Sequence, residues 1–327
     1  MATMVGFDIG AEELKIVQWN GSRVVRTASA PTPDNLISNG QIVSYEVMAD
    51  LIKETVKKEH ITGRSCSVIL PSTHAFLRRI TTPAMSVDQL LVNLPYEFRD
   101  FLTMDKEKYY YDYAVNSTVT DEDGTPTQLD LTACAVPKEV IAQYRAMFRR
   151  AGFKLKTAIP AECAYANLVS RFGSESQERC VIDLGHTATR IHIFVGSTFE
   201  TTRVIDMGVG LLVQAISDGL GVDEHVAHTY VLTNHEGVLE KEGAANLYQA
   251  ITMDIRKTIN FYGFNHRDSQ LQDAWCIGGG AQIAPLLETI RQSLDLTLHT
   301  SSELITGSGE DSSLLSSFAG AIGAAIQ

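Results

Sequence analysis

Long apolar runs, paired cysteines and an excess of positive charge are all missing from this sequence of 327 residues. No window approaches the ~20 apolar residues that a membrane-spanning helix needs, and Asp8 comes too early for a secretory leader. The small-residue stretch 318–326 is too short to anchor the chain in a bilayer. We therefore expect a cytoplasmic protein without direct membrane insertion.

Acidic residues outnumber basic ones, 39 to 27, and the formal net charge is −12. Such a field opposes contact with nucleic acid phosphates, so we expect no nucleic acid partner. The five cysteines, an odd number, lie apart from one another in the sequence. This spacing argues against a disulfide framework or a zinc site and favours reduced, buried thiols.

What the sequence does contain is an internal repeat. Residues 5–10, VGFDIG, return at 180–185 as CVIDLG, and at the same offset Lys15 corresponds to Arg190 and Gly21 to Gly196. Each copy is typical of an apolar strand, an Asp-x-Gly turn, a returning strand and a Gly-Ser turn. We expect two homologous lobes whose turns together hold a polyphosphate and its metal ion.

Hydrophobic periodicity predicts that each lobe begins with three strands. Strands are predicted at 3–9, 13–19 and 23–29 in the first lobe and at 179–184, 189–195 and 199–206 in the second. The expected domains are 1–84 with 158–178 as the core of lobe I, 85–157 as an inserted small α/β subdomain, 179–215 with 268–327 as the core of lobe II, and 216–267 as its helical part.

These motifs resemble those of the actin, Hsp70 and sugar kinase superfamily of ATP-binding proteins. Within it the chain is similar to the PilM family of type IV pilus assembly proteins and, more distantly, to the FtsA family. The resemblance rests on GFDIG at 6–10 with Lys15, PYEF at 95–98, AVPK at 135–138, AGF at 151–153, VIDLG at 181–185 and CIGGG at 276–280. It implies an α/β, two-lobed actin-like fold (a duplicated ribonuclease H-like fold) with a small insertion of the FtsA/PilM type.

The resemblance also implies a site for ATP and Mg²⁺. Asp8 and Asp183, at the ends of buried strands, would hold Mg²⁺ through its waters, and Gly10 and Gly185 would let the backbone approach the phosphates. Lys15, on the returning strand, would reach the β-phosphate as a point charge. The alternative is that both aspartates only cap turns.

Further nucleotide contacts follow from the same resemblance. The expected phosphate-side residues are Ala11, Thr187 and Gly208, and the expected adenosine-side residues are Gly278, Gly279, Gly280, Arg256, Lys257 and Asn260. Two alternatives stay open, because a strand-to-helix turn also explains the triple glycine and a solvated helix face also explains the basic pair.

The first turn departs from the family pattern. It reads Ala11-Glu12-Glu13 where relatives usually have Ser or Thr after the glycine. Two carboxylates near a polyphosphate weaken binding, so we expect at most a weak ATPase, with slow or no hydrolysis. Glu162 is the catalytic candidate, although the helix dipole alone explains a glutamate at a helix start.

In the PilM family, the region between the first lobe and its insertion receives a short N-terminal tail of a membrane-anchored PilN-like partner. The residues at the corresponding place are those around Leu70, Phe76, Leu91 and Tyr96. We therefore expect an assembly adaptor recruited by its partner to the inner face of the membrane. The alternatives are an FtsA-like protein that self-associates into filaments and a small-molecule kinase of the same superfamily.

Overall fold

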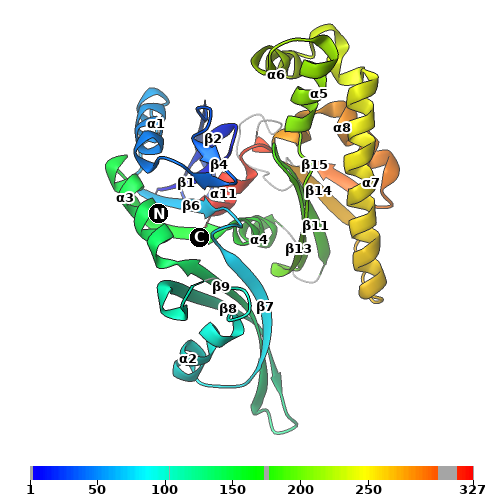
Figure 1. The fold of residues 1–327 in the computed structure, drawn as a ribbon. Helices are drawn as coiled ribbons and strands as arrows, with labels where there is room; N and C mark the ends of the chain where they lie inside the picture. The colour runs from blue at the N-terminus through cyan, green and yellow to red at the C-terminus, as the bar shows by residue number, and fades with distance from the viewer. Residues whose placement is uncertain (1–2, 103, 173–176, 301–314, 327) are drawn as a thin grey trace. The chain divides into compact units, whose positions relative to one another are not determined.

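The computed structural model describes residues 3–102, 104–172, 177–300 and 315–326 (Figure 1). The chain divides into two compact units. The first unit consists of Met1–Ala164 and Ala321–Gln327, and the second of Tyr165–Gly320.

The first unit is built on a five-stranded sheet in the order β10-β6-β1-β2-β3. Its strands are β1 (Met4–Ile9), β2 (Glu13–Trp19), β3 (Val24–Pro31), β6 (Ser65–Leu70) and β10 (Lys154–Pro160). β1 runs antiparallel to β2 and parallel to β6. Alternate residues of a strand face opposite sides, and Val5 and Phe7 join α1 (Tyr45–Lys58) and α3 (Lys138–Arg150) in one core.

A separate three-stranded sheet with the order β7-β9-β8 also belongs to the first unit. It consists of β7 (Phe76–Pro83), β8 (Tyr109–Thr120) and β9 (Pro126–Pro137), with α2 (Val87–Glu97) and the short 3-10 helix η1 (Lys106–Lys108) beside them. Ser86 and Gln89 form a capping box that starts α2, and Pro95 lies in its last turn. Leu94 and Phe98 join Ile80 in a small core of their own.

The boundaries of this small sheet differ from the expected insertion at 85–157. The sheet spans 76–137, because β7 is its first strand and β9 its last. α3 instead packs Tyr144 and Phe148 into the core of the larger sheet, and β10 is an edge strand of that sheet. The insertion therefore begins one strand earlier and ends before α3.

The opposite face of the larger sheet is covered by α11 (Ala319–Ala325). A Cβ atom added at Gly6 of β1 would overlap the carbonyl oxygen of Ala321, and one added at Gly323 would overlap that of Ala164. Small residues thus let the backbones touch. This corrects the expected lobe II core of 268–327, because residues 321–326 pack with the first unit. Residues 301–314 of that expected core lie outside the described residues.

The second unit repeats the sheet of the first, in the order β15-β14-β11-β12-β13. Its strands are β11 (Glu178–Leu184), β12 (Thr189–Val195), β13 (Thr198–Ile205), β14 (Asp273–Ile277) and β15 (Thr297–Thr300). β11 is antiparallel to β12 and parallel to β14, as β1 is to β2 and β6. The predicted duplication is therefore confirmed at the level of strand order and direction.

Helices cover one face of this second sheet. They are α5 (Gly210–Leu220), α6 (Glu224–Thr233), α7 (Glu242–Asn265) and α8 (Ala284–Ser293), with the short 3-10 helices η2 (His235–Glu240) and η3 (Gly279–Gln282). Ile182 and Cys276 of the sheet share a core with Leu212, Ile255 and Ile290 of these helices. α4 (Ala161–Phe172) contributes Tyr165 to the opposite face, where its ring contacts His192 of β12.

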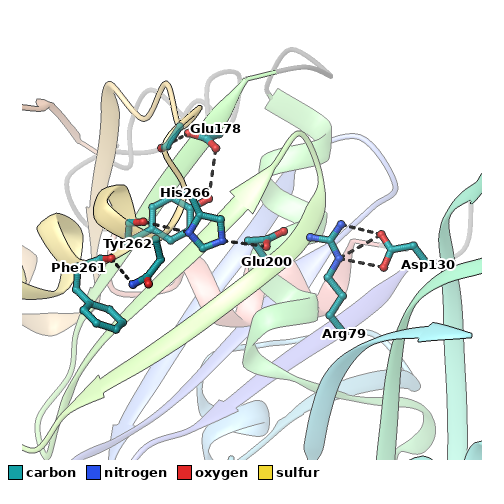
Figure 2. A network of polar contacts seen from close by, with 9 residues as sticks. Arg79, Asp130, Glu178, Glu200, Phe261, Tyr262 and His266 are labelled. Carbon is teal, nitrogen blue, oxygen red and sulfur yellow. Dashed lines mark hydrogen bonds and ion pairs between the residues drawn. The ribbon is translucent and has the colours of Figure 1, made fainter.

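The C-terminal end of α7 is tied to the start of β11 by Glu178 (Figure 2). One carboxylate oxygen of Glu178 accepts hydrogen bonds from Ser269 Oγ at 2.6 Å and from the Gln270 N–H at 2.8 Å, and the other accepts from Tyr262 at 3.3 Å. The His266 ring stacks on Tyr262 with centroids 4.2 Å apart. In the first unit, Figure 2 also shows the ion pair of Arg79 and Asp130, which joins β7 to β9 at 2.7 Å.

In the part of the chain that the structure describes, no helix has the length and apolar character to cross a membrane. All five cysteines are free thiols. Burial raises the pKa of Cys66, Cys163 and Cys276 to about 12, so these thiols stay protonated and unreactive at neutral pH.

Candidate functional site

The two Asp-x-Gly turns have the same geometry. Asp8 lies opposite Lys15 across β1 and β2, and Asp183 lies opposite Arg190 across β11 and β12. Opposite residues of an antiparallel pair project from the same face of the sheet with Cβ atoms ~5 Å apart. Each hairpin therefore has a carboxylate and a basic side chain on the same face of the sheet, next to the turn that joins its two strands.

Glycine is required in both turns by the backbone itself. The Gly10 N–H donates to the Glu13 carbonyl at 3.0 Å, and the Gly185 N–H donates to the Ala188 carbonyl at 3.1 Å. A Cβ added at Gly10 would lie 2.9 Å from the Glu13 oxygen, and one at Gly185 would lie 2.8 Å from the Ala188 oxygen. Any larger residue would push these turns open.

The first turn is braced by Thr32, the residue that follows β3. The Thr32 N–H donates to the Glu12 carbonyl at 2.8 Å, and its hydroxyl donates to the Gly10 carbonyl at 2.9 Å. The side chains of Ala11 and Glu12 are exposed. The turn is thus held by its backbone groups and by the Thr32 hydroxyl.

Three segments of the second unit meet around Asp183. The Val209 and Gly210 N–H groups donate to the carbonyls of Gly185 and His186, at 3.0 and 2.9 Å. A Cβ added at Gly278 would lie 2.6 Å from Asp183 Oδ1, and one at Gly280 would lie 2.7 Å from the Leu184 Cβ. The structure therefore brings together residues 183–188, 208–210 and 278–280, which are far apart in the sequence.

Some of these glycines are needed for packing and one is not. A Cβ at Gly208 would overlap the His186 carbonyl, and one at Gly210 would lie 2.5 Å from the His186 ring. Gly279 differs, since it is exposed and a Cβ added there would meet no atom within 4 Å. The backbone at Gly279 thus faces open space that a flat ligand group can fill.

The carboxylate of Asp183 is oriented by Tyr165 of α4. The Tyr165 hydroxyl donates to Asp183 Oδ2 at 3.1 Å, and its ring lies 5.0 Å from that of His192. His192 is fully buried, and burial followed by the charge of Arg190 lowers its pKa to about 3. Its Nδ1 lies 2.8 Å from the Thr202 hydroxyl. Tyr165 thus rests on a neutral imidazole and holds one oxygen of Asp183.

Sequence reasoning did not identify Tyr165 or Arg190. A tyrosine in a helix carries no local signal for a hydrogen bond to a strand end 18 residues later. Arg190 did have a signal, because the repeat aligns it with Lys15. Its Nη1 lies 3.7 Å from the place that a Cβ of Gly185 would occupy.

No three His, Cys, Asp or Glu side chains among the described residues form a cluster suited to a metal ion. A divalent ion at Asp8 or Asp183 would therefore need waters and ligand phosphates as its other ligands, which is how proteins usually bind Mg²⁺. Within the second unit, Thr187 is exposed beside the turn and offers a hydroxyl.

The remaining predicted nucleotide contacts lie on α7. Arg256, Lys257 and Asn260 are exposed, and Lys257 pairs with Asp254 at 2.9 Å. Neighbouring Ile255 is buried in the core of the second unit. The three polar residues therefore share the outer side of this helix, and their role stays a prediction.

The predicted catalytic residue Glu162 lies in the first turn of α4. It is half-buried. The pKa of Cys163 is raised mainly by the burial of that thiol and secondly by the negative charge of Glu162. A carboxylate in the first helical turn is stabilised by the helix dipole. Its catalytic role also stays a prediction.

The residues expected to contact a partner separate into buried and exposed ones. Leu70 is buried in the core of the larger sheet, so the expectation for this residue was wrong. Phe76 is partly buried against Tyr109, with ring centroids 6.2 Å apart. Leu91 and Tyr96, by contrast, are each about half exposed on α2.

More apolar side chains lie on the surface of α2 and the loop after it. Val87, Val92 and Phe101 are 62%, 67% and 49% exposed. Two basic groups rest on aromatic rings there: the Arg78 guanidinium lies 3.7 Å from the Phe101 ring centre, and Lys106 Nζ lies 4.0 Å from that of Tyr96. We call Val87, Leu91, Val92, Tyr96 and Phe101 the α2 surface.

Known structures share this fold. A solved PilM-PilN type IV pilus biogenesis complex matches with a TM-score of 0.82 at 20% identity, over 98% of this chain and 97% of that chain. The ethanolamine utilization protein EutJ from Carboxydothermus hydrogenoformans matches with a TM-score of 0.63 at 13% identity, over 100% and 90%. MreB5 of Spiroplasma citri bound to ADP matches at 0.54 and 13%, over 98% and 95%.

At these identities the structural matches establish the fold, which is the two-lobed actin-like fold that the resemblance implied. No curated protein sequence matches the chain. The family described as type IV pilus assembly protein PilM matches residues 6–306, which is most of the chain. The chain therefore belongs to the PilM family of type IV pilus assembly proteins.

Proposed function

We propose that this protein is an ATP-binding adaptor of pilus assembly that binds a segment of a membrane-anchored PilN-like protein. The main support for nucleotide binding is that three glycine-containing segments lie together around Asp183. The same Asp-x-Gly geometry occurs at Asp8 in the first unit. A repeated turn with a carboxylate and a basic residue suits a phosphate and its metal ion.

The residues of the second unit suit Mg·ATP in their chemistry. Tyr165 holds one oxygen of Asp183, and the other lies beside the Gly278 backbone, where a side chain would not fit. Bound Mg²⁺ would neutralise phosphate charge, and Asp183 would accept hydrogen bonds from its waters. Gly279 leaves open backbone on which an adenosine can rest.

The counterpart residues of the first unit are Asp8, Gly10, Ala11 and Lys15. We propose that the turn donates backbone N–H groups to phosphate and that Lys15 adds a positive charge. The side chain of Lys15 has no hydrogen bond or ion pair within the described residues. It is therefore available to an anion.

Slow or absent turnover follows from the acidic first turn. Glu12 is exposed and Glu13 half-buried, and both add negative charge near the proposed phosphate site. Glu162 is the residue that we propose for any remaining hydrolysis. ATP would then stabilise the folded adaptor by binding to it, and hydrolysis would not be needed.

The partner part of the proposal concerns the α2 surface. Its apolar side chains are exposed on a small sheet that has its own core. An apolar patch bordered by Arg78 and Lys106 suits a short segment with apolar and acidic residues. The similar solved structure is a PilM-PilN complex, which supports a PilN-like protein as the partner.

The nucleotide proposal is tested by titrating Mg·ATP into the purified protein in a calorimeter and assaying released phosphate. We expect binding without appreciable turnover, and loss of at least tenfold in affinity in Asp183→Ala. Asp218→Ala is the matched control, because Asp218 is an exposed aspartate of α5 in the same unit. Absence of binding to the unmodified protein would contradict the nucleotide proposal.

The partner proposal is tested with a synthetic peptide of the N-terminal segment of the PilN-like protein from the same genome. Leu91→Ser and Tyr96→Ser should each weaken binding at least fivefold, because buried apolar anchors dominate such contacts. Val204→Ser is the control, since Val204 is 50% exposed on β13 of the second unit. Equal loss in all three variants would show that the α2 surface is not the docking site.

A further inference from the structure

Arg190 is a half-buried basic residue beside the second Asp-x-Gly turn. It is on β12, opposite Asp183, and its Nη1 lies 3.7 Å from the place of a Gly185 Cβ. The repeat puts it at the position of Lys15 in the first unit. Each turn thus has a basic side chain at the same register.

The guanidinium of Arg190 has no hydrogen bond or ion pair within the part of the chain that the structure describes. The groups around it do have partners. Asp183 Oδ2 accepts from Tyr165, and the Thr189 hydroxyl donates to the Met207 carbonyl at 2.9 Å. His192, two residues along the strand, is kept neutral by burial. Among the described residues, no neighbouring group therefore accepts a hydrogen bond from the five N–H donors of Arg190.

A half-buried guanidinium loses part of its hydration, and without a hydrogen-bonded or closely paired acceptor it recovers little of that cost. Arginine is also the residue best suited to an anion with several oxygens, since its planar fork donates two parallel hydrogen bonds to phosphate. Both facts favour an anionic ligand at this place over a purely structural role.

We propose that Arg190 is a phosphate-binding residue of the second turn, which contacts the phosphate oxygens of the bound nucleotide. This inference rests on the nucleotide site proposed above, and it predicts which ligands that site prefers. A ligand with a polyphosphate gains from Arg190, and a nucleoside without phosphates does not.

The test uses Arg190→Gln and Arg190→Lys in the full chain, with Mg·ATP and adenosine as separate probes in calorimetry. Arg190→Gln should weaken Mg·ATP about tenfold or more, because hydrogen bonds to charged groups are among the strong ones. Arg190→Lys should recover part of that loss, since it keeps the charge without the fork. Adenosine should bind equally to all forms.

Arg203→Gln is the matched control. Arg203 is an exposed arginine on the neighbouring strand β13, opposite Ile191, and its replacement removes the same charge. It should change the affinity for Mg·ATP by less than twofold. The melting temperature of ligand-free Arg190→Gln should not fall, because the substitution removes a charge without a partner.

Two results would overturn the inference while leaving the nucleotide proposal standing. One is an affinity of Arg190→Gln for Mg·ATP within twofold of the unmodified protein. The other is an equal loss for ATP and adenosine, which would indicate a structural role. If the unmodified protein binds no Mg·ATP, the nucleotide proposal and this inference fall together.

Discussion

The two units arrange five strands in the same order, yet the middle of their central strands is different. The first unit has Gly6 where the second has Val181, at the same position of the repeat. Gly6 touches the backbone of α11, whereas Val181 is a buried branched side chain. A duplicated sheet can therefore accept a closely packed helix on one copy by giving up a single side chain.

A second difference lies in the turns. Glu12 of the first turn corresponds to Thr187 of the second, and Lys15 corresponds to Arg190. The backbone hydrogen bonds are nevertheless the same, at 3.0 and 3.1 Å. The repeat thus preserves backbone geometry while the side chains, and with them the local charge, have diverged.

The largest effect on stability is expected when Gly6 is given a side chain, as its counterpart Val181 has. In Gly6→Ala the new methyl group would overlap the Ala321 carbonyl and force α11 away from β1. We expect the free energy of unfolding to fall by about 3 kcal/mol, as for overpacked cores. Urea denaturation measures this loss.

Gly219→Ala is the control for that experiment. Gly219 is an exposed residue of α5, and a Cβ added there meets no atom within 4 Å. Alanine in a helix should raise stability by ~0.5–1 kcal/mol. An unfolding midpoint of Gly6→Ala equal to that of the unmodified protein would show that α11 is not closely packed on β1.

The next effect concerns His192, which corresponds to Val17 of the first unit. Its pKa is lowered from 6.5 to about 3 in the folded state. As the pH falls below 6.5, the unfolded chain takes up a proton that the folded protein does not. Stability should therefore decrease by about 1.4 kcal/mol per pH unit, or roughly 2 kcal/mol at pH 5.

His192→Val copies the first unit and isolates this contribution. Unfolding free energies of both proteins are compared at pH 7.5 and pH 5, and the variant should lose about 2 kcal/mol less between the two. If both proteins lose the same amount, His192 is not the group responsible.

A smaller effect is expected for Tyr165→Phe, which removes the hydroxyl that orients Asp183. The affinity for Mg·ATP should fall about fivefold, the contribution of one ordinary hydrogen bond. ATP binding in the presence of EDTA should not change, because the hydroxyl acts through the metal-binding carboxylate. Tyr230→Phe, on α6 of the same unit, serves as the control. An equal loss with and without Mg²⁺ would argue against this positioning role.

The smallest effect is expected when the first turn receives the residue of the second. Glu12→Thr removes an exposed negative charge near the proposed phosphate site and should tighten Mg·ATP binding about threefold at low salt. The gain should shrink at high salt, because screening weakens interactions between exposed charges. Glu54→Thr on α1 makes the same charge change and should have no effect.

Much of the fold could be predicted because its signals are local. Alternating apolar residues around each Asp-x-Gly turn predicted both strand pairs, and the structure preserves the repeat in its register, with Asp8 opposite Lys15 and Asp183 opposite Arg190. The Asn39-Gly40 turn between β4 (Ile37–Ser38) and β5 (Gln41–Ile42) was missed, although both residues have the positive φ that this dipeptide favours.

What could not be predicted depends on contacts between distant segments. The pattern of α3 indicates a helix but not which sheet it covers. The expected insertion of 85–157 therefore wrongly includes α3. The sequence does not reveal that Leu70 is buried, because this depends on its strand β6 lying between β10 and β1. Tyr165 reaches Asp183 only because α4 lies across the face of β11 and β12.

The return of α11 to the first unit has a consequence for the order of synthesis. The ribosome makes the whole second unit before it makes the helix that covers Gly6. At ordinary elongation rates this takes on the order of 10–30 s. Throughout that time the face of β1 at Gly6 lacks the helix that covers it in the finished fold, so the first unit can be completed only after the second unit has been made.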